Sequence, residues 1–330
     1  MMDIAVIGAG GWGSALAILL SENKHRVTLW AYESELVNEI SSKRTNSKFL
    51  PNKIFPENIY PSNDLNDAEK CELIVLAVPT QHLRSIASKL NLKNKIIVNL
   101  AKGIERDSLF RVSEILADAC NLSMEQYTVI TGPSHAEEVA NKIPTTVVAA
   151  SEHNLYEKQI IEIFTRPYFR LYSSLDVVGC EIGGSLKNVI AIAAGIVDGL
   201  NFGDNTKAAL ITRGLAETSR LGIALGANPA TFSGLSGLGD LYVTCSSKHS
   251  RNRFVGEQIG KGKKLSEIIN EMEMIAEGVS TTESAFALSR KHKVEMPITE
   301  NVYNILFEGL KPLEAINRLM SRESKREWWW

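Results

Sequence analysis

The chain has 330 residues, of which 44% are hydrophobic and 22% charged, values ordinary for a globular protein. That length exceeds what one hydrophobic core usually supports, so we expect two domains. The 36 basic and 38 acidic side chains give a net charge of −2, which argues against a nucleic-acid partner. No stretch approaches the roughly 18 uninterrupted apolar residues of an integral membrane segment.

The four cysteines are scattered and show no zinc-ligand spacing, and the six histidines are equally dispersed. We therefore expect reduced thiols and no metal site. The N-terminus has no cationic region ahead of its apolar run, and glycines break that run early, which is unlike a signal peptide. These features favour a cytoplasmic protein.

The first half of the chain alternates short β-branched runs with helical stretches. The predicted strands are Asp3–Ile7, Arg26–Trp30, Leu73–Val78, Ile96–Asn99, Thr128–Thr131, Thr145–Ala149 and Phe169–Tyr172. The predicted helices between them include Trp12–Leu20, Gln81–Leu90, Ser108–Ala119 and Asn154–Phe164. This alternation predicts a largely parallel sheet with helices on both faces. The runs IAVI and LIVLAV are apolar throughout, as expected of strands buried on both sides.

The alternation stops after about Leu175. Val177–Leu200 is rich in Ala, Ile and Gly and predicts one long buried helix, followed by helical segments broken at Gly226–Pro229, Gly234–Gly239 and Pro297. We therefore predict an α/β domain over residues 1–175 and an all-helical domain over residues 176–330. The final residues, Trp328–Trp330, suggest only a loosely packed terminus.

A glycine-rich turn follows the first predicted strand. Gly8, Gly10 and Gly13 form a G-x-G-x-x-G run that opens a helix, the context in which this motif binds a dinucleotide. Gly8 permits the tight turn, Gly10 lets the backbone approach a pyrophosphate, and Gly13 lets helix and strand pack closely. The helix N-terminus offers free N–H groups and a positive dipole end to phosphates. The first domain is therefore predicted to be of the Rossmann type, with NAD or NADP as cofactor.

The choice between NAD and NADP depends on the end of the second strand. An acidic residue there holds the ribose 2′-hydroxyl of NAD, whereas an Arg accommodates the 2′-phosphate of NADP. Glu33 occupies roughly this position, next to Tyr32, which favours NAD. Lys43 and Arg44 lie further on and offer a compensating charge, so both coenzymes stay open.

Two lysines are candidates for acid–base chemistry. If the chain moves a hydride from a secondary alcohol, some group must take the hydroxyl proton, and a lysine of lowered pKa does this. On a helix, Lys187 has small or apolar neighbours such as Gly183 and Ile190, so its ammonium is expected in a buried site. Lys102 follows a buried strand, where ligands gather. The alternatives are a solvated helix lysine and a loop lysine.

Three polar segments are further candidates, each with a plainer alternative. Asp240 follows the glycine-dense Gly234–Gly239 turn and caps a helix if it has no other role. The segment Ser250–Arg253 offers a guanidinium suited to phosphate, or is a solvated loop. Gly132 and Ser134 follow another strand end and offer N–H groups to a ligand, or Ser134 is a helix cap.

Eight segments occur in the order found in the bacterial NAD(P)-dependent glycerol-3-phosphate dehydrogenase family, which the chain resembles from Gly8 to about Leu310. They are GAGGWGSA, LIVLAVPTQ, AKGIE, GPSHAEEVA, GGSLKNVIAIAAGIVDGL, GLSGLGDLYVTC, SRNRFVGE and AEGVSTTES. The resemblance implies a Rossmann domain followed by a helical domain like that of 6-phosphogluconate dehydrogenase. It also implies interconversion of sn-glycerol 3-phosphate and dihydroxyacetone phosphate, supplying glycerol 3-phosphate for phospholipid synthesis.

The resemblance assigns Lys187 as the proton acceptor, with Lys102 and Asp240 beside it as catalytic residues. It implies substrate contacts from Lys102, Gly132, Ser134, Lys187, Asn188, Asp240, Thr244, Ser250, Arg251 and Asn252. Together with the glycine turn and the second strand, it implies cofactor contacts from Gly8, Gly10, Gly11, Trp12, Gly13, Tyr32, Glu33, Lys102, Ala136, Arg251, Ile275 and Glu277.

Two departures from the family pattern and two rival functions stay open. The family often has Ser at the position of Gly11 and Arg near Tyr32, so its usual NADPH use is in question here.

One rival function is that of a dehydrogenase of the same architecture acting on a 3-hydroxy acid or on 6-phosphogluconate, against which the AKG and SRNR segments argue. The other is a nucleotide-binding sensor without catalysis. A homodimer also stays open.

Overall fold

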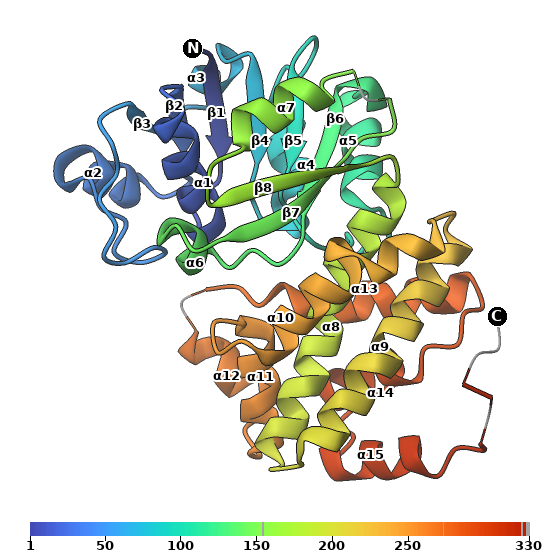
Figure 1. Cartoon of the computed structure of the whole chain (residues 1–330). Helices are drawn as coiled ribbons and strands as arrows, with labels where there is room; N and C mark the ends of the chain where they lie inside the picture. The colour runs from blue at the N-terminus through green and yellow to red at the C-terminus, as the bar shows by residue number, and fades with distance from the viewer. Residues whose placement is uncertain (154, 273, 325, 328–330) are drawn as a thin grey trace.

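A computed structural model shows a sheet with flanking helices, followed by a bundle of helices (Figure 1). It describes every residue except 154, 273, 325 and 328–330. The first residue of the predicted helix Asn154–Phe164 and the Trp328–Trp330 tail lie outside the described residues. The predicted class, a Rossmann-type α/β fold followed by a helical part, is confirmed.

The sheet has eight strands in the order β3-β2-β1-β4-β5-β6-β7-β8. They are β1 (Asp3–Ile7), β2 (Arg26–Trp30), β3 (Ile59–Ser62), β4 (Leu73–Leu76), β5 (Ile96–Asn99), β6 (Tyr127–Thr131), β7 (Thr145–Ala150) and β8 (Phe169–Ser174). All neighbouring pairs are parallel except β6 and β7. The carboxyl ends of β1 to β6 therefore meet along one edge, which is where ligands bind in open α/β sheets.

Helices cover both faces of the sheet, because alternate strand residues point to opposite sides. Ile4 and Val6 join a core with α1 (Gly11–Glu22), α2 (Ser34–Lys43), α6 (Ala136–Ala140) and α7 (Glu157–Phe164). Ala5 and Ile7 join a second core with α3 (Leu65–Glu69), α4 (Thr80–Ala87) and α5 (Val112–Cys120). A short 3-10 turn, Met124–Gln126, precedes β6.

Several predicted boundaries differ from the structure by a few residues, and the clearest differences are at β3 and at the start of α5. The edge strand β3 was not among the predicted strands, because its sequence IYPS lacks a β-branched run and contains Pro61, which is tolerated at a sheet edge. The helix predicted from Ser108 begins only at Val112, since Leu109 has φ +62° and the backbone N–H of Arg111 donates to Glu114 at 2.8 Å, which starts the helix there.

The second part of the chain is built around one helix, α8 (Val177–Gly199), which is buried along nearly its whole length. Around it lie α9 (Asp204–Ala224), a 3-10 turn Pro229–Ser233, a π-helical turn Leu235–Gly239, α10 (Asp240–Ser246), α11 (Arg251–Gly260), α12 (Leu265–Glu271), α13 (Glu277–Lys291), α14 (Pro297–Phe307) and α15 (Pro312–Met320). Within the described residues, α8 alone is long and apolar enough to cross a membrane, and its apolar window is entirely buried.

The N-terminal end of α8 also packs on the sheet part. Val177 and Cys180 belong to the core formed by Ala5 and Ile7, whereas Ile182 and Leu186 belong to the helical core. One continuous helix thus joins the two cores, and Figure 1 shows it running from the sheet into the bundle.

Candidate active site

The glycine turn lies between β1 and α1 with the geometry that a dinucleotide requires. Gly8 has φ +114°, and a Cβ there would lie 2.8 Å from the Ala77 carbonyl oxygen, so only glycine fits. A Cβ on Gly13 would lie 1.9 Å from the carbonyl oxygen of Gly8. At Gly10, an added Cβ would meet no described atom within 4 Å, which leaves the backbone accessible to a ligand. The turn fits a pyrophosphate at the N-terminus of α1.

A segment after α2 covers this turn. The Asn46 side chain donates to the Ala9 carbonyl at 2.8 Å and to Ser14 Oγ at 2.9 Å, and it accepts from the Phe49 N–H at 3.0 Å. The Phe49 carbonyl oxygen lies 2.9 Å from where a Cβ on Gly11 would be. Sequence reasoning missed Phe49, because nothing in its local pattern links it to a turn almost 40 residues earlier.

A buried cluster of one carboxylate and two ammonium groups lies at the carboxyl ends of the strands. Asp240 is fully buried, and its Oδ1 pairs with Lys187 while its Oδ2 pairs with Lys102 at 2.8 Å. Lys187 is only 8% exposed, so the predicted burial of its side chain is observed. Thr131, the last residue of β6, directs its hydroxyl at the same carboxylate, at 3.4 Å.

Three different parts of the fold deliver this cluster. Lys102 follows β5, Lys187 lies in the middle of α8, and Asp240 begins α10 directly after the π-helical turn. The turn packs so closely that a Cβ on Gly183 would lie 2.4 Å from the Ser236 carbonyl oxygen. Single π-helical turns often occur at functional sites. Here the turn seats the start of α10 against α8.

The electrostatics of the cluster make Lys187 readily titratable. Burial lowers the pKa of Lys187 to about 7, with Asp240 opposing this shift and the charge of Lys102 adding to it. Burial alone would raise the pKa of Asp240, but the charges of Lys102 and Lys187 lower it below its usual range. One ionised carboxylate thus faces two amines, which suits reversible proton transfer near neutral pH.

Several predicted substrate residues border the cluster. The Lys102 ammonium lies 3.3 Å from the Gly132 carbonyl oxygen, which also accepts from the Ser134 hydroxyl at 2.9 Å. Ser134 is therefore not a helix cap, since His135 precedes α6. The Thr244 hydroxyl donates to the backbone carbonyl of Asp240 at 2.6 Å.

His135 is a neighbour of the cluster that sequence reasoning missed. Burial, and then the charge of Lys187, lowers the pKa of His135, and its Nε2 is buried without a hydrogen-bond partner among the described groups. It lies within the GPSH segment after β6, so the rule that ligands gather at strand ends was the available signal.

The predicted phosphate-binding segment begins α11 rather than forming a solvated loop. The Ser250 hydroxyl accepts from the Arg253 N–H at 3.2 Å and caps the helix. Arg251 is exposed and donates to the Ile275 carbonyl at 2.8 Å, and the buried Asn252 side chain accepts from the Gly278 N–H at 2.9 Å.

The start of α13 meets the strand ends. Glu277 Oε1 accepts from the Thr80 N–H at 3.2 Å, just after β4. The same Thr80 packs against the loop of Lys102, since a Cβ on Gly103 would lie 2.7 Å from its Oγ1. Burial raises the pKa of Glu277. Residues from both parts of the chain therefore line one region around the lysine cluster.

Four other predicted site residues lie near the turn, on α8 or just before α13, without a described hydrogen bond to the lysine cluster. The Trp12 indole packs near Phe169, with ring centroids 6.4 Å apart, so a cofactor contact from Trp12 would come from its backbone. Ala136 lies beside the turn, its Cβ 3.6 Å from where one on Gly11 would be. Asn188 is buried on α8, and Ile275 is half exposed.

The region expected to discriminate between NAD and NADP lies at the end of β2. Tyr32 is 82% exposed, and Glu33 is half-buried with Lys48 Nζ 3.9 Å from its carboxylate. Arg44 is unsuited to compensate for Glu33, because its guanidinium donates to the carbonyls of Phe55 and Pro56. The cation that pairs with Glu33 is Lys48, which lies 15 residues further along the chain and which no local pattern marks as a site residue.

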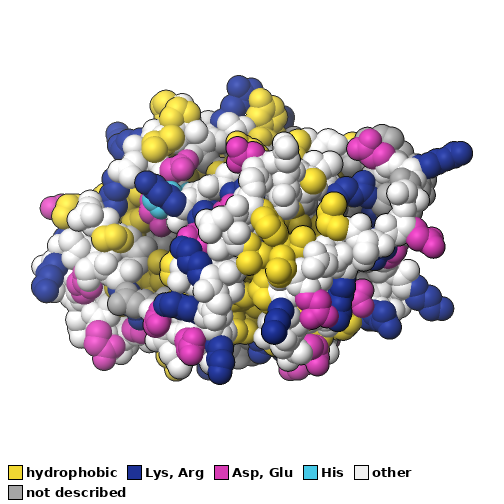
Figure 2. All heavy atoms as spheres, turned by 90° about the horizontal axis from the view of Figure 1, so that it is seen from below, with side chains coloured by type: hydrophobic (Ala, Val, Ile, Leu, Met, Phe, Trp, Pro, Cys, Tyr) yellow, Lys and Arg dark blue, Asp and Glu magenta, His cyan; other side chains and the backbone are white. Residues whose placement is uncertain are grey.

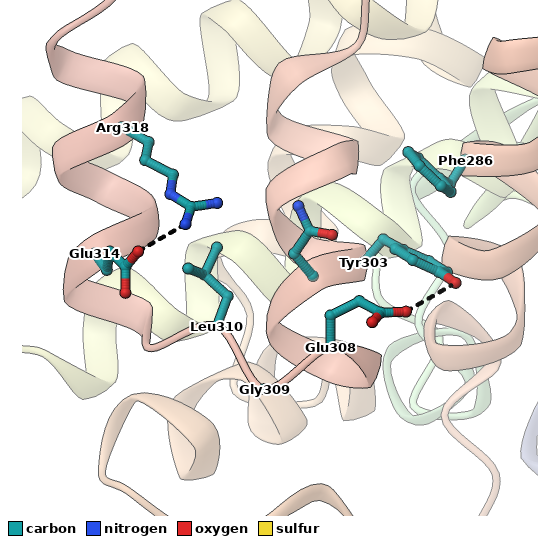
Figure 3. Close-up of a pocket in the computed structure, with 8 residues that line it drawn as sticks. Phe286, Tyr303, Glu308, Gly309, Leu310, Glu314 and Arg318 are labelled. Atoms are coloured by element: carbon teal, nitrogen blue, oxygen red, sulfur yellow. Dashed lines mark hydrogen bonds and ion pairs between the residues drawn. The ribbon is translucent and has the colours of Figure 1, made fainter.

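A hollow of about 620 Å³ lies elsewhere, among α13, α14 and α15 (Figure 3). The Tyr303 ring stacks on Phe286 with centroids 4.3 Å apart, and Arg318 pairs with Glu314 at 2.6 Å across from them. None of the residues lining it belongs to the lysine cluster. The chemistry therefore points to the strand ends rather than to this hollow.

Comparisons with known proteins agree with the geometry. The family model for the NAD-dependent glycerol-3-phosphate dehydrogenase N-terminus matches residues 3–156, and the model for its C-terminus matches residues 176–317. A glycerol-3-phosphate dehydrogenase of Citrifermentans bemidjiense, named as NAD(P)+-dependent, is 52% identical over 331 residues, covering 98% of each chain. Its namesake from Pelotomaculum thermopropionicum is 50% identical over 329 residues, covering 98% of this chain and 94% of the relative.

The solved structures give the same result. A crystal structure of glycerol-3-phosphate dehydrogenase from Coxiella burnetii matches with a TM-score of 0.93 at 38% identity, covering 97% of this chain and 99% of that one. The resemblance carried by the eight sequence segments is thereby confirmed. The chain belongs to the NAD-dependent glycerol-3-phosphate dehydrogenase family.

Proposed function

We propose that the chain interconverts sn-glycerol 3-phosphate and dihydroxyacetone phosphate with NAD(P), and so supplies glycerol 3-phosphate for phospholipid synthesis. The observation that carries this proposal is the buried cluster of Lys102, Asp240 and Lys187, which lies at the same carboxyl-terminal edge of the sheet as the glycine turn. A protein that only sensed the nucleotide would have no use for two amines sharing one buried carboxylate.

Lys187 is the proton-transfer residue in this proposal. In the oxidative direction its neutral amine takes the proton of the C2 hydroxyl, and in the reductive direction its ammonium returns that proton to the carbonyl oxygen. The bound nicotinamide supplies the hydride chemistry at C2. Because burial lowers the pKa of Lys187 to about 7, both protonation states are available near neutral pH.

Asp240 and Lys102 support this step. The Asp240 carboxylate holds both amines through its two oxygens, which fixes the Lys187 nitrogen in place. Lys102 stabilises the negative charge that develops on the substrate oxygen and, as a like charge, lowers the pKa of Lys187. Both catalytic roles depend on the burial of the cluster, since charge interactions are strongest where water is excluded.

The proposed substrate contacts come from both sides of the cluster. Arg251 and Asn252, with the Ser250 backbone at the start of α11, bind the phosphate group. Gly132 and Ser134 after β6, together with Lys102, Lys187, Asn188, Asp240 and Thr244, surround the three-carbon body. Residues 1–175 accordingly form the coenzyme domain and residues 176–330 contribute most of the substrate domain.

The proposed coenzyme contacts run from the glycine turn to α13. They are Gly8, Gly10, Gly11, Trp12, Gly13, Tyr32, Glu33, Lys102, Ala136, Arg251, Ile275 and Glu277. Glu33 favours NAD over NADP, since its carboxylate suits a ribose hydroxyl and repels a phosphate. The ion pair with Lys48 weakens that repulsion, so we expect NAD to be preferred and NADP to be used as well.

Two further features are proposed from composition and surface. The four cysteines are free thiols, as suits the reducing cytoplasm.

Apolar side chains gather on the end of the helical part that faces away from the sheet, bordered by charged ones (Figure 2). A homodimer would cover such a patch. Light scattering of the purified protein measures the mass that decides this.

The test of the function is to follow the absorbance of NADH and of NADPH as the purified enzyme reduces dihydroxyacetone phosphate. We expect turnover with both coenzymes and a higher kcat/KM for NADH. Turnover with a 3-hydroxy acid or 6-phosphogluconate in place of this substrate would overturn the proposal, as would tight coenzyme binding without turnover of any of them.

A further inference from the structure

A second buried carboxylate, Glu181, lies on α8 and is 5% exposed. Four donors surround it. Its Oε1 accepts from the Tyr127 hydroxyl at 2.5 Å and the Ser113 N–H at 2.8 Å, and its Oε2 accepts from Arg111 Nη1 and the Ser113 hydroxyl, both at 2.7 Å. Arg111 and Ser113 lie at the start of α5, and Tyr127 begins β6. Every donor thus comes from the sheet part of the molecule.

The position of Glu181 along α8 links these contacts to Lys187. The two residues are six positions apart in one uninterrupted helix, a separation of about 9 Å along the axis at 1.5 Å per residue. Hydrogen bonds that hold α8 at Glu181 therefore also restrict sliding and rotation of the helix at Lys187. These bonds come from the sheet part, which also holds the glycine turn.

The same network reaches the other lysine. The Asn99 side chain lies near enough to the Tyr127 hydroxyl to lower its pKa, against the larger raising effects of burial and Glu181. Its Oδ1 also accepts from the Ala101 N–H at 2.9 Å, and its Nδ2 donates to the Ala101 carbonyl at 3.1 Å. Ala101 directly precedes Lys102. Tyr127 therefore lies between the support of Lys102 and the anchor of the helix that carries Lys187.

We infer that Glu181 is a positioning residue that sets the distance of Lys187 from the coenzyme and from Lys102, an inference that rests on the proposed function. Hydrogen bonds occupy both of its oxygens, so it takes no part in the proton transfer itself. A buried ion pair adds little stability over a well-packed apolar pair, but its directed bonds fix one arrangement of the packed elements. That is the property a proton-transfer site requires.

The variant that tests this inference is Glu181→Gln, which keeps the side-chain volume but removes the charge and one acceptor. Arg111 keeps a partner in Glu114, at 3.1 Å, so we expect the variant to fold. Misplacing a reacting group by about 1 Å costs up to ~100-fold in rate. We expect kcat to fall at least ~10-fold while NADH binding stays unchanged. We also expect Tyr127→Phe to lower kcat less and to be non-additive with Glu181→Gln.

A matched control is Glu217→Gln. Glu217 is another buried carboxylate, on α9, and it accepts from the N–H groups of Ile298 and Thr299 and from the Thr299 hydroxyl, all within the helical part. This variant removes a comparable set of hydrogen bonds without touching the junction of α8 with the sheet. We expect it to lower the melting temperature and to leave kcat within about twofold of the wild type.

The deciding measurement needs no turnover. The pH dependence of amine labelling at Lys187, read by mass spectrometry on the coenzyme-free enzyme, reports the surroundings of its nitrogen. We expect its midpoint to move in Glu181→Gln and to stay in place in Glu217→Gln. The inference would be overturned if Glu181→Gln kept both the wild-type labelling midpoint and the wild-type kcat. It would be overturned in the same way if only the melting temperature of this variant fell. A wild type without turnover of dihydroxyacetone phosphate would refute the proposed function instead, and the labelling comparison would still test the anchor.

Discussion

At the scale of single residues, the site depends on the ratio of one carboxylate to two amines. Asp240 balances one ammonium charge, so the second buried amine loses its proton more easily than a lysine in water. Lys187 is the more deeply buried of the two, with its side chain 10% exposed against 14% for Lys102. The amine whose pKa is lowered is the one on α8.

This arrangement predicts opposite pH dependences for the two directions. Oxidation needs the neutral amine, so its kcat/KM rises as the pH passes through about 7 and then levels off, whereas reduction declines above that pH. In Lys102→Met a repelling charge is lost and Asp240 pairs with Lys187 alone, so both limbs move to higher pH. Steady-state rates between pH 5.5 and 10 measure this. If the pH profiles of both directions stay unchanged in Lys102→Met, then the charge of Lys102 does not set the pKa of Lys187.

Glu33 carries a second prediction at this scale. The substitution Glu33→Gln removes the negative charge that disfavours a 2′-phosphate. It also leaves Lys48 without its ion-pair partner, so that its ammonium can attract the 2′-phosphate of NADPH. We expect the ratio of kcat/KM for NADH to that for NADPH to fall about tenfold or more, as for one charged hydrogen bond. An unchanged ratio would place coenzyme discrimination elsewhere.

The glycine turn and the burial of Lys187 were predictable because both are local. A strand, three glycines and the start of a helix lie within about a dozen residues, and the small neighbours of Lys187 are its own helical neighbours. The contacts of Asp240 were not predictable from spacing, since a capping aspartate has the same local sequence. Only the family resemblance marked it as a site residue.

At the scale of elements, α8 and α11 approach each other through glycines. A Cβ on Gly195 would lie 1.9 Å from the Arg253 carbonyl oxygen, and one on Gly256 would lie 1.9 Å from that of Ile192. This close contact seats the start of α11, with Arg251 and Asn252, beside the helix that carries Lys187. Glycine is therefore needed here for proximity rather than for backbone conformation.

We predict that Gly256→Ala moves α11 away from α8. Overpacking of this kind costs about 1–3 kcal/mol of unfolding free energy. Since α11 holds the proposed phosphate contacts, KM for dihydroxyacetone phosphate should rise several-fold more than KM for NADH. The control is Gly203→Ala, where an added Cβ meets no described atom within 4 Å. Equal changes in both KM values would show that the close approach does not serve the phosphate site.

Element boundaries were harder to predict than element types. The buried strands and α8 were evident from their apolar runs, but β3 carries a proline and polar residues because it lies at the sheet edge. The start of α5 depends on Leu109 at positive φ, which no propensity favours. The first exception follows from the place of β3 at the sheet edge, and the second from the backbone conformation of Leu109 and the hydrogen bond between Arg111 and Glu114, which helix propensity does not indicate.

At the scale of the whole molecule, the site exists only where the two parts meet. Lys102 and Asp240 are 138 residues apart in the chain, and Lys187 lies 53 residues before Asp240. The sequence predicted two domains and the motifs in each. It could not place the motifs against each other, because that depends on how α8 docks on the sheet. The hydrogen bonds around Glu181 are part of that docking.

The most direct test of the account is the turnover of Lys187→Ala, with Lys187→Met as a variant that retains the buried volume. Circular dichroism, the melting temperature and NADH binding check that each variant is folded. Positioned acid–base catalysis contributes about 10²–10⁴-fold, so we predict a loss of at least 100-fold in kcat for both variants with coenzyme binding intact. A folded variant that reduces dihydroxyacetone phosphate at nearly the wild-type rate would contradict the assignment of proton transfer to Lys187.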